Sequence, residues 1–307
     1  MTRTAALPVG VSVFERGWLS SNCILLADQE QAVLVDSGYA THSDQTLLLV
    51  RSSLGSRPLD KLWNTHLHSD HCGGNAALQS RYPALQTAVP PGMADKVRDW
   101  DPIALGYVPI GQECPRFTID AVLEAGTELA AAGGTWQVHA SPGHDAHSVI
   151  LFEPESATLV SADALWENGF GVVFQEIEGE HAFDEVGRTL DLIEALDPVL
   201  VIPGHGSTFS SVTTALASAR RRLESFACNP RKHALHAAKV LLKFRLLEKQ
   251  EMTRPDMLRW ARSTPYMNLI ACRWFPEVEL DSWMDWLSEQ LIHSGAARYH
   301  GDLLVNG

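Results

Sequence analysis

Cysteine is scarce in this chain of 307 residues, and its positions form no recognisable framework. The five cysteines are widely spaced and include no C-x-x-C pair: Cys23, Cys72, Cys114, Cys228 and Cys272. This distribution argues against a disulfide scaffold and against a thiolate zinc finger. We interpret the cysteines as small inert thiols in a reducing compartment, with Cys72 set apart because it lies inside the histidine-rich motif described below.

Long hydrophobic runs and an excess of basic residues are also missing. No run approaches the roughly 20 apolar residues that span a bilayer. Met1–Val13 lacks the cationic start, apolar centre and A-x-A site of a secretory signal. The net charge of -13 disfavours bulk attraction to nucleic acids and anionic membranes. These absences predict a cytoplasmic protein with no membrane partner, and they favour a small-molecule partner over nucleic acid.

What the chain does contain is an alternation of strands and helices. Hydrophobic residues make up 45% of the sequence and charged residues 20%, an ordinary globular composition. Apolar runs predict strands at Cys23–Ala27, Ala32–Asp36, Lys61–Asn64, Thr135–Ala140, Ser148–Phe152, Thr158–Ala162 and Val199–Ile202. Helical spacing predicts helices at Thr46–Leu54, Gly74–Tyr82 and Phe183–Leu196. The alternation predicts an α/β protein whose sheets are covered by helices.

The pattern changes after about Thr213, where long amphipathic helices take over. Helices are predicted at Thr214–Phe226, Lys232–Glu248 and Trp283–His293, with a further helix start at Thr253–Asp256 and a small hairpin at Ser294–Val305. We therefore predict two units, residues 1–213 and a mostly helical unit of residues 214–307.

The most specific motif runs from Thr65 to Gly74 and reads T-H-L-H-S-D-H-C-G-G. In an extended segment, residues two apart project to the same side, so His66 and His68 point together. Asp70 and His71 follow where the chain turns into a predicted helix. Four donors within six residues can divide between two adjacent cations, and imidazole with carboxylate suits zinc, iron or manganese. A single histidine is most often an ordinary surface or core residue, but so dense a cluster favours metal binding.

Three later turns supply further donors of the same kinds. His144 follows Pro142-Gly143 after a predicted strand, and His205 follows Pro203-Gly204 after another. Asp163 ends an apolar strand, where an unpaired carboxylate is costly. Each taken alone is ordinary turn chemistry, but their order along the chain favours one shared metal site.

Together these motifs resemble the metallo-β-lactamase superfamily over roughly Val13–Ser210, and in particular the branch with glyoxalase II and related thioesterases, lactonases and nucleases. The resemblance implies two sheets packed face to face between outer helices, the αββα sandwich. It implies that His66, His68 and His144 bind one metal and that Asp70, His71 and His205 bind a second. Asp163 is then the bridge, and Asp36, in the family's D-x-G turn, supports the site without binding metal. The helical tail loosely resembles the winged-helix tail of some relatives.

Two departures qualify the resemblance. Many relatives of glyoxalase II have two histidines four apart after the Pro-Gly turn, whereas His144 and His147 are three apart, so His147 is expected only beside the site. Secreted β-lactamases of this fold often use another second-metal set and carry a signal peptide, so antibiotic hydrolysis is disfavoured.

The implied mechanism is attack by a hydroxide that bridges two metals, most simply zinc, because a bound cation lowers the pKa of water to about 7. Asp70 is the candidate catalytic residue, since it is placed to hold the hydroxide in line. No G-x-S-x-G elbow is present. Cys72 is an alternative nucleophile, but packing beside the metal loop is the favoured interpretation.

The substrate is less clearly indicated than the reaction. The leading hypothesis is hydrolysis of a small ester, thioester or lactone. The alternatives are a nuclease or phosphodiesterase acting on single-stranded RNA or a nucleotide, a persulfide dioxygenase with a single iron, and a non-catalytic metal-holding regulatory protein. Residues 93–117, with Trp100 and Tyr107, are expected to overhang the metals, and Trp166, Phe170 and Phe174 to line the same mouth.

A basic stretch interrupts the acidic background. Between Ala217 and Gln250, nine Lys or Arg face only two Glu, so this stretch carries +7 and the rest of the chain -20. Such a stretch is most simply a solvated helix face. The alternative is a surface for an anionic substrate, such as a CoA thioester, a nucleotide or single-stranded RNA.

Overall fold

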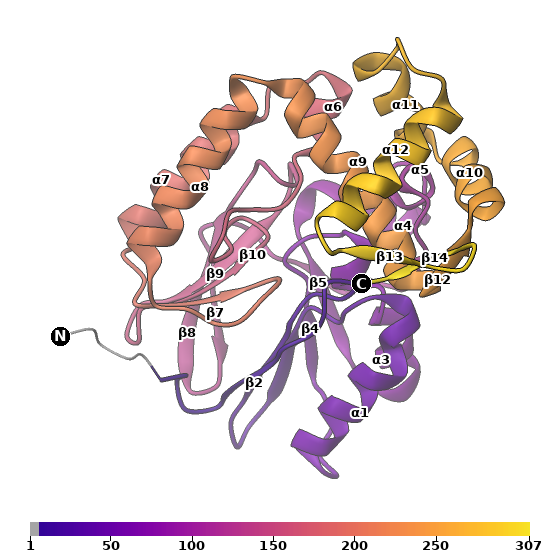
Figure 1. The fold of residues 1–307 in the computed structure, drawn as a ribbon. Coiled ribbons are helices and arrows are strands. Elements are labelled where there is room, and N and C mark those ends of the chain that lie inside the picture. The colour runs from indigo at the N-terminus through magenta and orange to yellow at the C-terminus, as the bar shows by residue number, and fades with distance from the viewer. Residues whose placement is uncertain (1–5) are drawn as a thin grey trace.

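Two β-sheets lie face to face at the centre of the computed structural model, which describes residues 6–307 (Figure 1). The first sheet contains, in spatial order, β1 (Val11–Phe14), β2 (Cys23–Ala27), β3 (Ala32–Val35), β4 (Lys61–Trp63), β5 (Gln86–Val89) and β6 (Ala121–Val122). The second contains β11 (Leu200–Pro203), β10 (Thr158–Ala162), β9 (Val149–Glu153), β8 (Gly134–Ala140) and β7 (Glu128–Ala131). All seven predicted strands are present within one or two residues of their predicted bounds, so this part of the fold prediction is confirmed.

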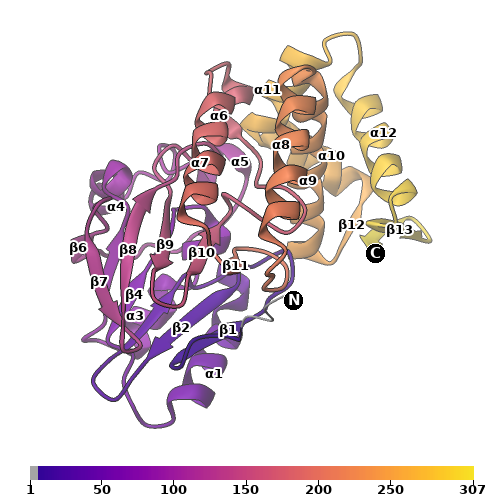
Figure 2. The ribbon, with the colours of Figure 1, turned by 90° about the vertical axis from the view of Figure 1, so that its left-hand side faces the viewer.

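Helices cover the outer face of each sheet. α1 (Ser43–Leu54) and α3 (Asn75–Arg81) pack against the first sheet through Val50 and Leu78, while α7 (Phe183–Leu196) and α8 (Val212–Ala227) pack against the second through Leu190 and Leu216. The view in Figure 2 shows α7 and α8 side by side over the second sheet. The predicted αββα sandwich is therefore confirmed.

The inner faces of the two sheets form one apolar layer. Strand residues alternate between the faces of a sheet, so every second side chain of β2, β3 and β8 points inward. Ile24, Val33, Trp136, Val138 and Leu151 meet there and are almost fully buried. This rigid layer fixes the strand ends from which the candidate metal-binding loops depart.

The C-terminal unit contains the remaining helices and a small third sheet. Its elements are α9 (Pro230–Lys249), β12 (Glu251–Thr253), α10 (Arg254–Ser263), α11 (Pro265–Trp274), α12 (Leu280–His293), β13 (Ala297–His300) and β14 (Leu303–Asn306). The predicted terminal hairpin is β13–β14, and β12 pairs with β14 to complete a three-stranded sheet. Leu242, Met267, Trp283 and Leu287 lie in the core of this unit.

The predicted division of the chain at residues 213 and 214 stays a prediction, and the packing favours a later point. α8 begins at Val212 and shares its apolar core with the second sheet and α7, not with α9–α12. Asn229 then caps the start of α9 by accepting a hydrogen bond from the Lys232 amide. We propose that the C-terminal unit begins there, after α8.

Short helices fill the connections near the ends of the strands. They are α2 (Ser69–Cys72), α4 (Ala94–Asp99), α5 (Tyr107–Ile110) and α6 (Phe174–Glu178), with 3-10 turns at Ala40–His42 and Pro91–Met93. Among residues 6–307, no helix combines the length and apolar character needed to cross a membrane.

Candidate metal centre

The candidate metal-binding residues come together at one edge of the sandwich, because each follows the end of a strand. His66 and His68 lie between β4 and α2, and Asp70 and His71 lie in α2. His144 follows β8, Asp163 follows β10 and His205 follows β11. All seven predicted donors belong to groups whose ligand atoms lie within 4.8 Å of one another.

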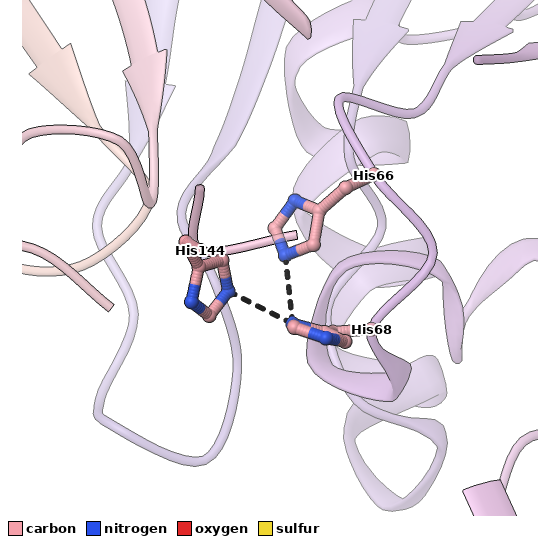
Figure 3. A group of neighbouring side chains, drawn as sticks. All are labelled: His66, His68 and His144. Carbon is pink, nitrogen blue, oxygen red and sulfur yellow. Dashed lines mark hydrogen bonds between the residues drawn. The ribbon is translucent and has the colours of Figure 1, made fainter. Parts of the chain in front are cut away.

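Three histidines form the first group (Figure 3). Nε2 of His66 lies 3.1 Å from Nδ1 of His68, and Nε2 of His144 lies 2.8 Å from the same nitrogen. The three rings come from two loops that are 76 residues apart between His68 and His144. Three nitrogens that converge this closely match the predicted first site.

Asp163 lies between this first group and a second group, which consists of Asp70, His71 and His205. Its Oδ2 is 3.4 Å from Nε2 of His144 and 3.8 Å from Nε2 of His205, while its Oδ1 is 3.4 Å from Nε2 of His71. His205 Nε2 also lies 3.1 Å from Oδ2 of Asp70. Asp163 thus contacts histidines of both groups, the arrangement expected of a bridging carboxylate.

A local distortion of β10 directs Asp163 into the site. The pairing between β10 and β11 shifts register between Val160 and Ala162, and Ala162 has φ of 47°, in the left-handed region. A β-bulge bends its strand and re-aims the side chains that follow it. No sequence signal marks this bulge, because alanine is not a residue that favours positive φ.

Hydrogen bonds behind the rings fix which nitrogens face the centre. His144 Nδ1 donates to the Val172 carbonyl at 2.6 Å, so its Nε2 carries the lone pair that faces His68. His71 Nδ1 donates to Oδ2 of Asp36 at 2.7 Å. Asp36 also accepts from the amide and hydroxyl of Thr65, at 2.9 Å and 2.8 Å, and so anchors the histidine loop to α2. Asp36 therefore supports the site without joining a donor group.

Burial and mutual charge set the protonation of these residues. Burial lowers the pKa of His66 and lowers that of His144 to about 4, which leaves both rings neutral at neutral pH. Burial alone would raise the pKa of Asp163, but His71 and His205 outweigh it and hold that pKa well below the usual range. Burial would lower the pKa of His71, but Asp163 and Asp36 outweigh it and raise that pKa well above the usual value, so this histidine must release a proton when a cation binds.

The buried polar atoms also fit a bound cation. Among the described side chains, Nε2 of His71 is buried and has no hydrogen-bond partner, although it faces Asp163. At two glycines the backbone passes so close to a donor side chain that no larger residue would fit. A Cβ at Gly204 would lie 2.1 Å from Asp163 Oδ1, and one at Gly171 would lie 2.3 Å from His144 Nδ1. Nitrogen and carboxylate oxygen donors in this mixture suit zinc, iron or manganese.

Comparison with known proteins agrees with this geometry. A model of the metallo-beta-lactamase superfamily matches residues 16–205, which include all seven donors. The chain belongs to this superfamily.

Curated relatives within the superfamily share the hydroxyacylglutathione hydrolase name. The protein of that name from Synechococcus sp. strain JA-3-3Ab is 33% identical over 149 residues, 45% of this chain and 52% of that protein. One from Brucella anthropi is 24% identical over 214 residues, 67% of this chain and 66% of that protein. The chain thus spans about half of the first relative's length.

A solved structure shows that the fold extends over the whole chain. A metallo-beta-lactamase family protein from Thermus thermophilus superposes with a TM-score of 0.55 and 19% identity, covering 98% of this chain and 100% of that one. At this identity the comparison concerns the fold alone.

An apolar cavity of about 370 Å³ lies beside the candidate metal donors. Five of the candidate donors line it: His68, Asp70, His144, Asp163 and His205. Trp18, Trp166, Phe174, Val240, Leu241 and Phe244 form most of its walls. Trp18 stacks on His205 with the ring planes 10° apart, and 57% of its surface is exposed, so it stands at the rim.

Several wall residues were missed or misplaced by sequence reasoning. Trp166 and Phe174 line the cavity as expected, but Phe170, which is buried in the core beside the second sheet, does not, and neither do Trp100 and Tyr107. Those two pack with Phe117 and Cys72 in a separate buried cluster, since local sequence cannot separate a pocket wall from core packing. From residues 93–117, only Ile110 and Gln112 reach the cavity. Trp18, Val240 and Phe244 had no motif that could identify them.

His147 and Cys72 take no part in the donor groups. The His147 side chain is exposed, packs against Gly92 and belongs to no group of close donor atoms, whereas its neighbour Asp145 lies 3.9 Å from Nε2 of His68. Cys72 is fully buried beneath α5, and burial raises the pKa of its thiol well above the usual value. A thiol held neutral in this way is a poor nucleophile.

Proposed function

We propose that this protein is a metal-dependent hydrolase of a small ester, thioester or lactone, with two divalent cations, most simply zinc. The observation that carries the proposal is the convergence of five histidines and two aspartates, five of which line an apolar cavity. In this assignment His66, His68 and His144 hold one ion, Asp70, His71 and His205 hold the other, and Asp163 bridges both. Iron and manganese fit the same donors.

The bound cations would lower the pKa of water toward neutrality and polarise the substrate carbonyl. The residues of the chain perform the remaining tasks. Asp70 lines the cavity, and its Oδ2 lies 3.1 Å from Nε2 of His205, so the two atoms can face the same cation. Burial would raise the pKa of Asp70, but His205 and the nearby His71 lower it, so the carboxylate stays ionised and can accept a hydrogen bond from water. The aromatic walls exclude bulk water from the reacting group.

The cavity favours a small molecule over a polymer. Its volume of about 370 Å³ suits a compact ligand, and its walls are mostly apolar. The relatives named hydroxyacylglutathione hydrolase act, by their name, on an acylglutathione, which is a thioester. This supports placing a thioester first among the three substrate classes.

Several Lys and Arg side chains of the basic stretch are engaged in contacts within the protein, which weakens the nuclease alternative. Arg220 pairs with Asp191 and Glu194, Arg231 with Glu277, and Arg245 and Lys249 with Glu248. Lys243 donates to the Ala296 carbonyl at 2.5 Å and to Asn306. Three carboxylates outside the stretch, Asp191, Glu194 and Glu277, thus offset part of the +7, whereas Glu248 is already included in that count.

The metal content of the purified protein tests the assignment of two metal ions. Protein purified without chelators should contain close to two transition-metal ions per chain by elemental analysis, because seven donors in overlapping groups are more than one ion needs and Asp163 contacts histidines at both ends of the set. One ion or fewer after reloading would contradict the two-metal assignment and would favour a mononuclear centre.

A substrate panel tests the reaction class. The metal-loaded protein should hydrolyse a thioester or lactone, with kcat/KM changing only slightly between about 50 and 200 mM salt, since few charged contacts are screened. A nuclease that neutralises roughly six to ten phosphates should lose about 10³–10⁵ in affinity over the same range. RNA cleavage that exceeds ester turnover, is abolished by His68→Ala and falls steeply with salt would establish the nuclease instead.

A further inference from the structure

A single arginine stands in the wall of the apolar cavity without a carboxylate partner. Arg222, on α8, is the only Lys or Arg among the described residues that line the cavity. It takes part in none of the ion pairs formed within residues 6–307, whereas Arg220, on the same helix, has two. A cation buried without a counterion is costly, so its place in a substrate cavity calls for an explanation.

The guanidinium of Arg222 is held by neutral groups. It lies 5.7 Å from the ring centre of Phe170 and 5.3 Å from that of Phe226, distances at which aromatic faces attract a cation. NH2 donates to Nε2 of His236 at 2.6 Å, and NH1 donates to the Asn168 carbonyl at 3.3 Å. Burial lowers the pKa of His236 to about 3, so this histidine accepts as a neutral ring.

These contacts orient the guanidinium but do not neutralise it. An arginine has five N–H donors, and two hydrogen bonds are made within the described residues. Nε is buried with no partner, and burial lowers the pKa of Arg222. The aromatic rings, His236 and Asn168 therefore hold a cation in a fixed position with donors to spare.

The acidic donors occupy another part of the same cavity. Asp70, Asp163 and Arg222 all line it, and one loop runs beside both Arg222 and His144: a Cβ at Gly169 would meet Arg222 NH1 at 2.7 Å, and one at Gly171 would meet His144 Nδ1 at 2.3 Å. Two residues of extended chain span at most about 7 Å. The arginine and the candidate donors are thus within reach of one small ligand, and Trp166, Phe174 and Leu241 line the same cavity.

We infer that the substrate of the proposed hydrolase carries a carboxylate on the portion that fills this cavity, at the end remote from the scissile bond, and that Arg222 binds it. A guanidinium presents a planar fork that matches a carboxylate in a bidentate manner. The absence of any second cation from the described lining favours a single negative charge over a phosphate. This inference rests on the proposed function and narrows its substrate to an acyl compound with a distal carboxylate.

Binding of two matched ligand series to the metal-loaded protein tests this inference without requiring turnover. Quenching of tryptophan fluorescence reports occupancy, because Trp18 and Trp166 line the cavity. The ligands are linear dicarboxylates of four to eight carbons and the monocarboxylates of equal length, which share the metal-binding end and differ only at the far end. At the matching length, the dicarboxylate should bind about 10- to 100-fold more tightly, the range for a hydrogen bond to a charged group.

Three variants assign the preference to Arg222. Arg222→Gln should reduce the dicarboxylate preference to near one, Arg222→Lys should retain part of it, and Arg221→Gln, at the exposed neighbouring position, should leave it unchanged. A preference that survives in Arg222→Gln, or no preference at any length in the wild-type protein, would overturn the inference. Metal content and thermal unfolding of each variant separate this result from misfolding. If the protein hydrolysed no substrate of the panel but still preferred dicarboxylates, the proposed function would be contradicted, whereas the binding of a carboxylate by Arg222 would be supported.

Discussion

Asp163→Ala should remove measurable hydrolysis and sharply reduce the content of both metal ions. Asp163 is the one carboxylate that contacts histidines of both donor groups, at 3.4 Å from His71 and His144 and 3.8 Å from His205. Its loss leaves Asp70 as the only carboxylate among the seven candidate donors. Elemental analysis and the rate with the best substrate of the panel measure the two effects.

His147→Ala is the matched control, because His147 lies on the same loop as His144 but is exposed and outside the donor groups. It should bind two ions and retain most of the activity. Equal damage from Asp163→Ala and His147→Ala would show that the ligands are misassigned. Loss of only one ion in Asp163→Ala would show that the carboxylate serves a single site.

Asp36→Ala should weaken metal binding although Asp36 belongs to no donor group. Its carboxylate accepts hydrogen bonds from His71 Nδ1 and from the amide and hydroxyl of Thr65. Removing the partner that orients a metal-binding histidine typically costs about 10- to 100-fold in metal affinity. Each buried donor left unpaired also costs about 1–3 kcal/mol of folding free energy. Competition with a chelator measures the first effect and denaturant unfolding the second.

Asp36→Asn separates charge from backbone conformation. Asp36 has φ of 59°, a left-handed conformation that Asn adopts more easily than Ala. The Asn variant should keep most of the folding stability and still lose metal affinity, because an amide polarises His71 less than a carboxylate does. Unchanged metal affinity in both variants would contradict the role assigned to Asp36.

The clustering of the seven candidate donors could be predicted from sequence because its determinants are local. Most donors sit close to glycine or proline in a turn directly after an apolar strand, so residue type and context coincide within a few positions. His66 and His68 follow β4, and His205 follows β11. The strands themselves were recognisable because they are buried on both faces and read as short apolar runs.

The cavity wall could not be predicted, because it forms only when distant segments pack together. Phe244 and Arg222 lie on α9 and α8 in patterns that read as ordinary amphipathic helices, and nothing local separates them from core or solvated residues. The prediction that Trp100 and Tyr107 line the cavity was wrong for the same reason. These residues pack against Phe117 and Cys72, which are close to them in the fold, in a separate buried cluster. Asp191, Glu194 and Glu277 offset part of the charge of the basic stretch from outside it, which a count along the stretch does not include.

The two sides of the cavity come from different stretches of the chain. The segment that matches the superfamily model ends at residue 205, the last metal donor, whereas Arg222, His236 and Phe244 lie beyond it. The matched segment supplies the candidate donors and most of the cavity lining, while α8 and α9 supply the remainder. Substitutions at the lining positions of these two helices would therefore change the shape and charge of the cavity without replacing a candidate donor.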